Sequence, residues 1–593
     1  VVIRMNKGWK PDLTEDYGVW IKTITVESFN NYFEDITITN SGTDVFFTTG
    51  TKNAVNNTFL NVSYSSENAS LAGTNSMELI RKWYYQAYVN DSLGNAVVAN
   101  VSSTNSSGAV EFSVMTNSSG WVADKQEITD YYRAGFSGNG IRSYYNSVVS
   151  AVNSTYATTN STYNATADET NVNDNIQMSI GPNVYGCGAL DTENQIYTLQ
   201  SDLSTDGDCL TITVSNVTVD GNGYDVIGDG DDGDYGIQTN ADANLTNITI
   251  KNFGNIGNFS HGIYFDMVNN SLIYNNTMNS EVAIDTYAIY LMDGDSNIVY
   301  DNEINWNATG TSKKSYGIYL SSFVGVTAGN NNITGNALAI NSALSNAYGV
   351  DSHNGGTSNS NTIQSNTFDI DAEYAAHGIF IDGGALGNVI FNETIDVRSA
   401  FPSESYGIWL YNVDSSNFSS CTINTTTSGG SGSAYDFYMS GRSDHNVLYD
   451  NELLGENYSV YILDAGNNNN TFVNVSYAGS ESVAASSDLT RKWYYQSYVN
   501  DSNGLAVEGV DISGVDNSNF EIFSLSTDSA GNIVQQELVE YTQNWTQVYG
   551  VNVSTKSNYT INATDTIYKN ILSIATKENG KYLKEYNWVW SNQ

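Results

Sequence analysis

The sequence predicts an all-β protein, built as a solenoid of parallel β-coils together with two small antiparallel β-sandwiches. Short runs of β-branched and aromatic residues alternate with Asn, Asp, Gly and Ser turns throughout the 593 residues, a pattern typical of strands. One five-residue phrase occurs nine times between residues 235 and 463, and a twelve-residue segment occurs twice. The 3.6-residue period of an amphipathic helix is not evident within 235–463.

The repeated phrase sets the length of one coil. Its variants run from YGIQT at 235–239 to YSVYI at 458–462, and their second residues fall 26 to 32 residues apart, with a last interval of 23. These second residues are Gly236, Gly262, Ala288, Gly317, Gly349, Gly378, Gly407, Asp436 and Ser459. A second phrase such as NIVYDNEI follows most copies of the first. Repeats of this length are typical of solenoids.

A single coil cannot bury its apolar face, but stacked coils can. Each strand then pairs with its equivalent one coil along, and the inward Ile, Val and Leu side chains form continuous columns. Asn-rich turns can stack into hydrogen-bonded ladders in the same way. The chain has only 3 Pro, as expected where nearly every backbone N–H has to reach the next coil.

The turn segment VTVDGNGYDVIG at 217–228, with the stretch that begins CGALDTENQIYTLQ at 187, carries a family resemblance. It resembles the right-handed parallel β-helix repeat proteins of the pectin-lyase-like class, in particular secreted surface members found in archaea. The resemblance covers roughly residues 183–482 and implies a right-handed solenoid. The class includes polysaccharide lyases and hydrolases, so it also implies that an enzyme has to be considered.

The cysteines suit this solenoid. Cys187 and Cys209 lie about one coil apart in sequence, and residues one coil apart are roughly 5 Å from each other, which fits a disulfide. We therefore predict a bridge that closes the first coil; the alternative is two reduced thiols stacked in the core. Cys421 has no partner and is expected to be a buried small apolar side chain.

The twelve-residue segment RKWYYQAYVNDS at 81–92 returns as RKWYYQSYVNDS at 491–502. Each copy follows a coil-like segment, NNTFLNVSY or NNTFVNVSY, and precedes alternating apolar residues broken by Gly turns. Alternation of this kind predicts a small antiparallel β-sandwich, and these regions resemble Ig-like or carboxypeptidase-regulatory-like modules. The segment thus marks the junction where a β-helix ends and a sandwich begins, with Trp83 and Trp493 covering the last coil; a plain core strand of the sandwich is the alternative.

These patterns predict four domains: partial β-helix coils at 1–78, an Ig-like sandwich at 79–182, the main β-helix at 183–482 and a second Ig-like sandwich at 483–593. The phrase YGVWI at 17–21 places two or three coils in the first of them. So small a stack is marginal alone. One alternative is that coils preceding this stack are missing from the chain, which lacks an initiator Met and resembles a processed or excerpted mature protein. The other is that the stack packs on another subunit, which gives a head-to-tail polymer.

Charge and sequons indicate an exported protein. Lys and Arg total 22 against 64 Asp and Glu, for a net charge of −42, which repels nucleic acid. No apolar run approaches the ~18 residues of a membrane span. Asn-x-Ser/Thr sequons are frequent, which favours a secreted, N-glycosylated surface protein. The candidate glycan sites are Asn61, Asn90, Asn117, Asn160, Asn216, Asn258, Asn307, Asn392, Asn474, Asn500, Asn552 and Asn562.

No catalytic residues are predicted. The cations of the main β-helix, at Lys251, Lys313, Lys314, Arg398 and Arg442, fall at scattered points of the repeat. Asp231 and Asp232 form a carboxylate pair, but no basic motif follows them. His261 and His377 occupy the repeat position that Tyr holds elsewhere, roughly 19 Å apart at four coil rises, so we expect them to stack in a ladder rather than to share a metal or a proton. We therefore expect the chain not to be an enzyme.

One cofactor is considered. Asp229, Asp231, Asp232 and Asp234 alternate with Gly as ligands in calcium loops often do, so calcium binding there is one interpretation and a solvated acidic turn is the other. No other cofactor is expected.

The sequence favours a structural cell-surface protein, the subunit of an extracellular filament or S-layer-like assembly used for attachment, with copies of itself and surface glycans as partners. The alternative function is a carbohydrate-binding or polysaccharide-degrading β-helix protein, with an aromatic and Asp-lined groove.

Overall fold

The computed structural model is all-β, and no helix occurs among the residues that it describes. These are residues 17–593 except 24, 40–41, 92–93, 139–140, 154, 167–169, 240–243, 323–328, 355–359, 401–402, 429–432, 456, 485, 502, 517, 546–550, 556–558, 565–570, 576–585 and 591–593. The contacts divide the chain into two compact units, Val1–Asn183 and Val184–Gln593. The division falls beside the predicted boundary at 182/183, and the other predicted domain boundaries stay predictions.

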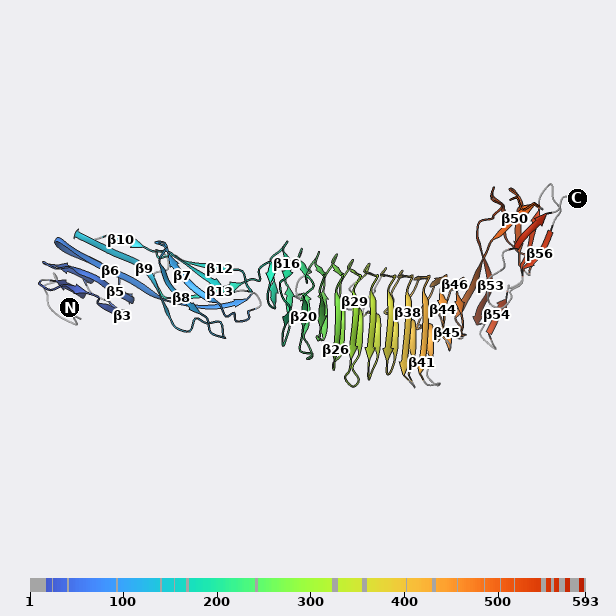
Figure 1. The fold of residues 1–593 in the computed structure, drawn as a ribbon, viewed down its shortest axis with the longest axis horizontal. Coiled ribbons are helices and arrows are strands. Elements are labelled where there is room, and N and C mark those ends of the chain that lie inside the picture. The colour runs from blue at the N-terminus through green and yellow to red at the C-terminus, as the bar shows by residue number, and fades with distance from the viewer. Residues whose placement is uncertain are drawn as a thin grey trace. The chain divides into compact units, whose positions relative to one another are not determined.

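The second unit contains the predicted right-handed parallel β-helix, whose stacked coils run from β16 to β45 in Figure 1. Each coil contributes one strand to each of three parallel sheets. Sheet 1 has 12 strands: β15 (Gly188–Leu190), β18 (Leu210–Ile212), β21 (Tyr235–Thr239), β24 (His261–Asp266), β27 (Thr286–Met292), β30 (Ser315–Ser322), β33 (Ala347–Asn354), β36 (Ala376–Asp382), β39 (Ser405–Tyr411), β42 (Ala434–Ser440), β45 (Tyr458–Ile462) and β48 (Ser480–Val483).

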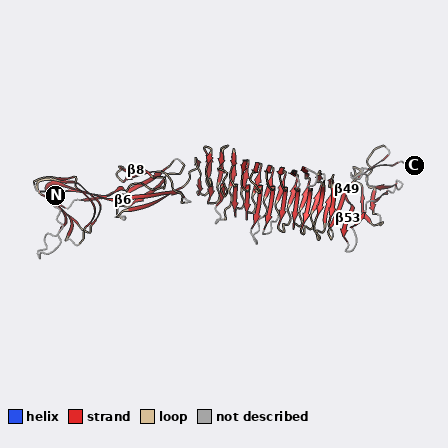
Figure 2. Ribbon diagram, turned by 90° about the horizontal axis from the view of Figure 1, so that it is seen from below, coloured by secondary structure: helices blue, strands red, loops and turns tan. Residues whose placement is uncertain are grey.

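Sheets 2 and 3 complete each coil, and Figure 2 shows the strands side by side along the solenoid. Sheet 2 begins with β14 (Asn183–Val184), β16 (Ile196–Leu199), β19 (Thr218–Asp220), β22 (Thr249–Lys251), β25 (Leu272–Tyr274), β28 (Ile298–Tyr300), β31 (Asn332–Thr334), β34 (Thr362–Gln364), β37 (Val389–Phe391), β40 (Asn417–Ser419), β43 (Val447–Tyr449) and β46 (Asn470–Val473). Sheet 3 comprises β17 (Leu203–Ser204), β20 (Asp225–Ile227), β23 (Asn255–Gly257), β26 (Thr277–Val282), β29 (Glu303–Ala308), β32 (Ala337–Ser342), β35 (Thr367–Ala372), β38 (Thr394–Ala400), β41 (Thr422–Ser428), β44 (Glu452–Leu453) and β47 (Ser476–Tyr477).

Strand register places like residues in columns, as the repeat predicts. In sheet 1, Ile263 pairs with Ile289, which pairs with Ile318, and all three are fully buried. The Gly of the repeated phrase has a packing reason, since a Cβ on Gly317 would lie 2.6 Å from the backbone oxygen of Gly349 in the next coil.

Two ladders of polar side chains follow the corners on either side of sheet 2. In one of them, the backbone N–H of Asn302 donates to Oδ1 of Asn336 (3.0 Å), and the backbone N–H of Asn336 donates to Oδ1 of Asn366 (2.9 Å). Glu393 and then Cys421 take the next two places in this ladder. At a corner the backbone turns away from the neighbouring strand, so its buried N–H groups have no strand partner. The ladders supply a side-chain acceptor from the next coil instead.

The first unit contains the predicted short coil stack. Its parallel strands are β1 (Tyr17–Thr23), β2 (Ser28–Phe29), β3 (Tyr32–Thr37), β4 (Thr43–Thr49), β5 (Ala54–Ser63) and β6 (Glu67–Asp91). Strands β9 (Gln126–Gly138), β10 (Ile141–Tyr144) and β13 (Val172–Met178) extend the same sheet, and a separate antiparallel sheet contains β7 (Asn100–Asn105), β8 (Val110–Met115), β11 (Ser147–Val152) and β12 (Thr159–Tyr163).

The second unit ends in comparable antiparallel pairing. Its last strands are β49 (Asp488–Tyr495), β50 (Ser497–Asp501), β51 (Asp511–Val515), β52 (Glu521–Ser526), β53 (Gln536–Trp545), β54 (Val551–Thr555), β55 (Tyr559–Thr564), β56 (Ile571–Ala575) and β57 (Tyr586–Trp590). An Ig-like class for the antiparallel regions of either unit stays a prediction.

The repeated twelve-residue segment lies at the predicted junction in both units. Strand β6 pairs in parallel with the coil strand β5 and antiparallel with β9, and β49 pairs in the same two ways with β46 and β53. The indole N–H of Trp83 donates to Asp130, and that of Trp493 donates to Glu540. The segment is therefore a strand that closes a coil stack and begins an antiparallel sheet.

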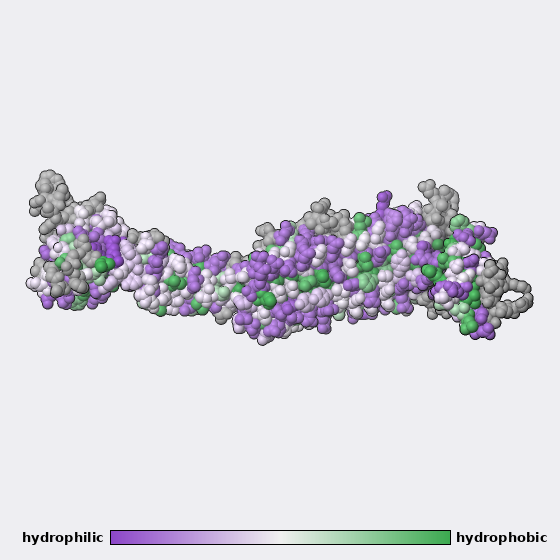
Figure 3. Space-filling model, turned by 90° about the horizontal axis from the view of Figure 1, so that it is seen from above, coloured by the Kyte–Doolittle hydropathy of each residue, from purple (hydrophilic) through white to green (hydrophobic). Residues whose placement is uncertain are grey.

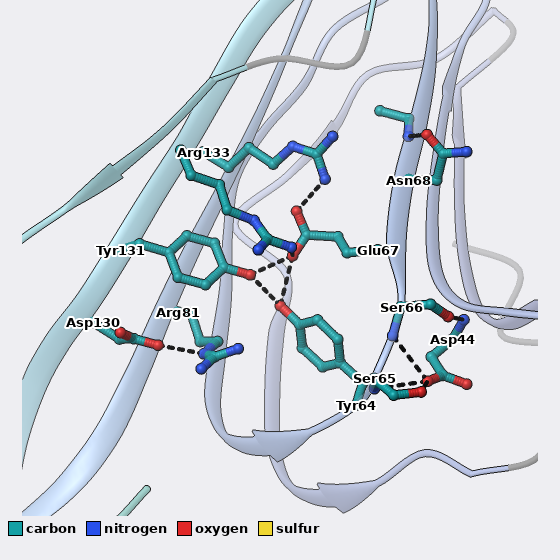
Figure 4. Close-up of polar contacts among 12 residues, drawn as sticks. Asp44, Tyr64, Ser65, Ser66, Glu67, Asn68, Arg81, Asp130, Tyr131 and Arg133 are labelled. Atoms are coloured by element: carbon teal, nitrogen blue, oxygen red, sulfur yellow. Dashed lines mark hydrogen bonds and ion pairs between the residues drawn. The ribbon is translucent and has the colours of Figure 1, made fainter. Parts of the chain in front are cut away.

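Each closing strand carries a buried arginine over aromatic rings. Arg81 pairs with Asp130, and nearby the hydroxyls of Tyr64 and Tyr131 point at Glu67 (Figure 4). Burial would raise the pKa of Glu67, but hydrogen bonds from Arg133, Tyr131 and Tyr64 hold it below its usual value. The end of the stack is thus closed by a polar cluster together with the buried apolar side chains of Met77 and Leu79 on the same strand.

The predicted disulfide is present between Cys187 and Cys209, with a Cα–Cα distance of 4.5 Å. Cys421 is a free, buried thiol as expected, and burial raises its pKa to about 12. Among the described residues, the structure has no helix that is long and apolar enough to span a membrane.

Candidate functional site

The outer face of sheet 1 carries two columns of aromatic side chains. The side chains of the intervening Ile column point into the core, so the flanking residues of each strand point outward. The first column contains Tyr235, His261, Tyr287, Tyr316, Tyr348, His377, Tyr406, Tyr435 and Tyr458. The second contains Gln238, Tyr264, Tyr290, Tyr319, Asp351, Phe380, Trp409, Tyr438 and Tyr461. Figure 3 shows apolar side chains gathered among polar ones along the face of the second unit that it presents.

Rings of the first column stack on one another along the solenoid. Successive ring centroids are 4.4–5.5 Å apart and their planes lie within 27° of parallel. His261 and His377 lie in this stack, as their repeat position predicts. Burial lowers the pKa of His261 to about 4 and that of His377 to about 3, so both imidazoles are neutral at pH 7.

The last two rings of the second column, Tyr438 and Tyr461, are turned against the first column, whereas Tyr290 and Trp409 lie within 31° of Tyr287 and Tyr406. The plane of Tyr461 makes 77° with that of Tyr458, and the plane of Tyr438 makes 65° with that of Tyr435. Tyr438 and Tyr461 are themselves parallel within 2°, with centroids 5.6 Å apart. Because the first column stacks along the solenoid axis, Tyr438 and Tyr461, which are turned away from it, lie beside each other along that axis. These two rings form an aromatic platform in which Tyr461 is partly exposed and Tyr438 is 7% exposed.

Asp351 interrupts the second column between Tyr319 and Phe380. Its side chain is 4% exposed, and among the described residues its Oδ1 atom has no hydrogen-bond partner. Burial raises the pKa of Asp351 well above its usual value. The charge of Lys314 opposes this rise, and the charge of Asp382 adds to it. Burial therefore favours the protonated form of the Asp351 carboxyl, which can donate a proton.

A second carboxylate lies on the next coil. Asp382 Oδ2 is 3.3 Å from Nδ1 of His353, whose side chain is half exposed. Burial raises the pKa of Asp382, while His353 and the backbone N–H of Gly383 act against that rise. The ammonium of Lys314 lies 6.0 Å from the ring centroid of Tyr348. Two carboxyl groups with different surroundings, an imidazole and an ammonium thus share one stretch of the outer face, the composition of an acid–base site.

Sequence reasoning missed this cluster, although it left a signal. The repeated phrase reads YGIYL at 316–320 but YGVDS at 348–352, so an acid stands where other coils have a ring. In the sequence Lys314 is an isolated cation, because spacing alone does not show that its charge acts on Asp351 in the next coil.

The acidic turn that the sequence offered as a calcium site does not gather ligands. Asp229, Asp231 and Asp232 are exposed, and burial followed by repulsion from the neighbouring carboxylates raises the pKa of Asp234. Within the described part of the chain, no group of three or more His, Cys, Asp or Glu side chains is placed to hold a metal ion. Calcium binding at this turn stays a prediction.

The predicted glycan sites differ in exposure. Asn117, Asn160 and Asn392 are exposed, whereas Asn90 is 9% exposed. The side chain of Asn552 lies outside those that the structure describes. The remaining sites are half-buried: Asn61, Asn216, Asn258, Asn307, Asn474, Asn500 and Asn562. Glycosylation at each of the predicted sites stays a prediction.

No protein-family model and no curated protein matches the chain. Solved structures that it resembles include the Dettilon tailspike protein, with TM-score 0.38 and 13% identity over 64% of this chain and 72% of that one. Another is the catalytic domain of a GH87 α-1,3-glucanase in complex with nigerose, with TM-score 0.28 and 13% identity over 65% and 83%. A third is a tailspike mutant of E. coli bacteriophage HK620 in complex with a pentasaccharide, with TM-score 0.28 and 10% identity over 62% and 85%.

The expectation that the chain is not an enzyme is wrong as stated. It relied on cations scattered through the repeat, but the fold brings Lys314, His353, Asp351 and Asp382 to one stretch of sheet 1. The structures that the chain resembles also include a glucanase. What this chain shares with them is an all-β fold built around a right-handed parallel β-helix.

Proposed function

We propose that this chain is a carbohydrate-active protein whose sheet 1 binds an extended polysaccharide along its outer face. The observation that carries the proposal is the double aromatic column over nine coils, interrupted by Asp351. Aromatic rings present a flat apolar surface for the C–H face of a sugar, and the hydroxyls of Tyr supply hydrogen bonds at its edge. The repeat of the columns at about 4.8 Å per coil suits a polymer better than a single small molecule.

The polysaccharide is expected to be neutral. The chain carries a net charge of −42, and the same outer face carries Asp266, Asp293 and Asp382. A polyanionic glycan would meet repulsion at both short and long range, whereas hydroxyl groups can donate to these carboxylates.

The platform at the C-terminal end of the columns gives a direct test of binding. The double variant Tyr438→Ala with Tyr461→Ala should weaken binding about tenfold, since each aromatic contact contributes roughly 0.5–1.5 kcal/mol. The matched control is Tyr274→Ala with Tyr300→Ala, a stacked pair 4.6 Å apart on the outer face of sheet 2. Binding is measured as retardation in native gels that contain dextran, laminarin, soluble starch or polygalacturonate. Equal loss in both variants, or retardation by polygalacturonate alone, would contradict the proposal.

The Asp351 cluster extends this function to cleavage. In a hydrolytic step, the Asp351 carboxyl gives its proton to the glycosidic oxygen as the bond from that oxygen to the anomeric carbon breaks. Water adds to the anomeric carbon, and Asp382 takes a proton from this water. The two products gain one water between them, and both carboxyl groups exchange protons with solvent to return to their first states. A substrate oxygen has to come within about 3 Å of Asp351, which requires the glycan to displace the side chains that bury it.

Asp351→Asn should therefore abolish cleavage and keep binding. The expected loss of rate is on the order of 10² to 10⁴, measured as reducing ends released from a polysaccharide that the wild type binds. Asp371→Asn, an exposed carboxylate on sheet 3, is the control. The wild-type rate should fall as pH rises, because Asp351 has to be protonated to act as the acid. A rate that Asp351→Asn leaves unchanged would exclude this residue as the acid.

The hypothesis of a filament or S-layer subunit has less support. The C-terminal end of each coil stack is a closing strand with a buried arginine, Arg81 or Arg491, and such an end does not offer a free edge for coils of another copy. An extracellular location is part of our proposal, supported by the Cys187–Cys209 disulfide, since such bonds persist in oxidising surroundings.

A further inference from the structure

The first unit carries a small aromatic face of the same design as sheet 1. Its first strand contains the repeated phrase as YGVWI, with Val19 and Ile21 buried and Tyr17 and Trp20 partly exposed. Trp20 pairs with Phe46 of the next coil. Tyr17 and Trp20 therefore occupy the two positions that form the aromatic columns of sheet 1.

The rings of this face are held in a fixed arrangement. Tyr17 stacks on Phe46 with centroids 4.4 Å apart and planes within 5°, and the rings of Tyr17 and Trp20 are 5.3 Å apart. The indole N–H of Trp20 donates to Oγ1 of Thr48 at 2.9 Å. The Lys22 ammonium lies 4.3 Å from the Trp20 ring centroid. Side chains held in this way lose little further freedom on binding a ligand.

The neighbouring positions are polar and small. Phe46 pairs with Asn68 and Thr48 pairs with Ser70 on the third coil. Three rings thus adjoin hydroxyl, amide and ammonium groups on one side of the sheet. This mixture suits a sugar, which presents a C–H face to rings and hydroxyls to polar groups. It suits an apolar protein surface poorly, because that surface would leave Lys22, Asn68 and Ser70 without water.

We propose that Tyr17, Trp20 and Phe46 form a second saccharide site, so that one chain binds a neutral polysaccharide at two independent places and crosslinks it. The inference rests on the proposed function for the identity of the ligand, but the two faces are separate in sequence and lie in different units. Each face can therefore be removed without touching the other. A protein with two sites per chain and a polymer with many repeats would together form a network.

The experiment compares four full-length proteins: the wild type, Trp20→Ala with Phe46→Ala, Tyr438→Ala with Tyr461→Ala, and the combination of all four substitutions. The ligand is the neutral polysaccharide that retards the wild type in native gels. Its oligosaccharides are titrated into each protein in a calorimeter to count the sites, and precipitation of the long polymer by each protein is followed by turbidity. The wild type should show two classes of site and precipitate the polymer. Each double variant should lose one class and no longer precipitate it, and the combination should lose both.

Two further variants guard against a simple folding defect. Trp20→Phe keeps an aromatic ring and should retain the second site, whereas Lys22→Gln changes only an exposed side chain and should weaken that site several-fold. Undiminished site number and turbidity in Trp20→Ala with Phe46→Ala would overturn the inference. Undiminished binding in Tyr438→Ala with Tyr461→Ala, together with loss of one class of site in Trp20→Ala with Phe46→Ala, would support the inference and overturn the function proposed for sheet 1. Loss of the site in Trp20→Phe as severe as in the double variant would count against a stacking role.

Discussion

Asn336→Ala should be among the most destabilising single substitutions in the solenoid. The Asn336 amide donates to the carbonyl oxygen of Val299 at 2.9 Å and to Oδ1 of Asn366 at 3.0 Å, and its Oδ1 accepts the backbone N–H of Asn302 at 3.0 Å. Asn336 is 1% exposed, so water cannot replace these bonds without opening the coil. Each buried group left without a partner costs about 1–3 kcal/mol. We expect a total loss of roughly 2–5 kcal/mol in the free energy of unfolding.

The matched control is Asn341→Ala on strand β32 of the same coil, where the side chain is exposed on sheet 3. Urea unfolding followed by circular dichroism should show a lower midpoint for Asn336→Ala and little change for Asn341→Ala. Hydrogen exchange should localise the effect to the coils of Asn302, Asn336 and Asn366, since each coil contacts only its neighbours. Equal midpoints for the two variants would mean that the ladder does not stabilise the corner.

The ladder illustrates what the sequence does predict. Period, strand type and Asn-rich corners follow from residues that recur at one position per coil, because stacking forces equivalent residues into the same surroundings. The inward Ile column, the stacked His261 and His377, and the Cys187–Cys209 bridge all follow from that single rule. Each of these predictions needs only the coil to which a residue belongs and its place within the coil.

The acid–base cluster could not be predicted in this way, because it depends on departures from the repeat. Asp351 breaks the aromatic column, and its burial depends on the side chains of neighbouring coils rather than on its own position. His353 reaches Asp382 across one coil, and Lys314 precedes the strand of the coil before Asp351. The intervals between coils vary from 23 to 32 residues, so sequence distance alone does not bring these groups together.

Glu393 is another departure from the repeat, and it makes the stability of the solenoid depend on pH. It takes the place of an Asn in the ladder, is 1% exposed, and accepts the backbone N–H of Asn366 at 2.9 Å. Burial raises the pKa of Glu393 from 4.5 to about 8, although the hydrogen bonds from Asn366 oppose the rise. The folded chain therefore favours the protonated carboxyl.

The sign of the effect follows from this direction. Below pH 4.5, Glu393 is protonated in both the folded and the unfolded chain, and it has no linkage cost. As pH rises from 4.5 to about 8, the unfolded chain releases this proton while the folded chain keeps it, so the free energy of unfolding falls. Above about pH 8 both states are ionised and the loss is complete. At about 1.4 kcal/mol per pH unit, the loss is on the order of 3–5 kcal/mol.

Glu393→Gln should remove this loss, because a neutral amide keeps the shape and hydrogen-bonding capacity of the protonated acid. The variant should match the wild type near pH 4 and exceed its stability by roughly 3–5 kcal/mol at pH 8.5. Urea unfolding at pH 4, 6 and 8.5 measures the difference, and Glu373→Gln, an exposed residue one coil earlier, should leave the pH dependence unchanged. A gap between wild type and Glu393→Gln that is constant with pH would show that packing, not ionisation, separates them. A gap that opens between pH 4 and 8.5 would locate the cost in the single carboxylate of an otherwise neutral ladder.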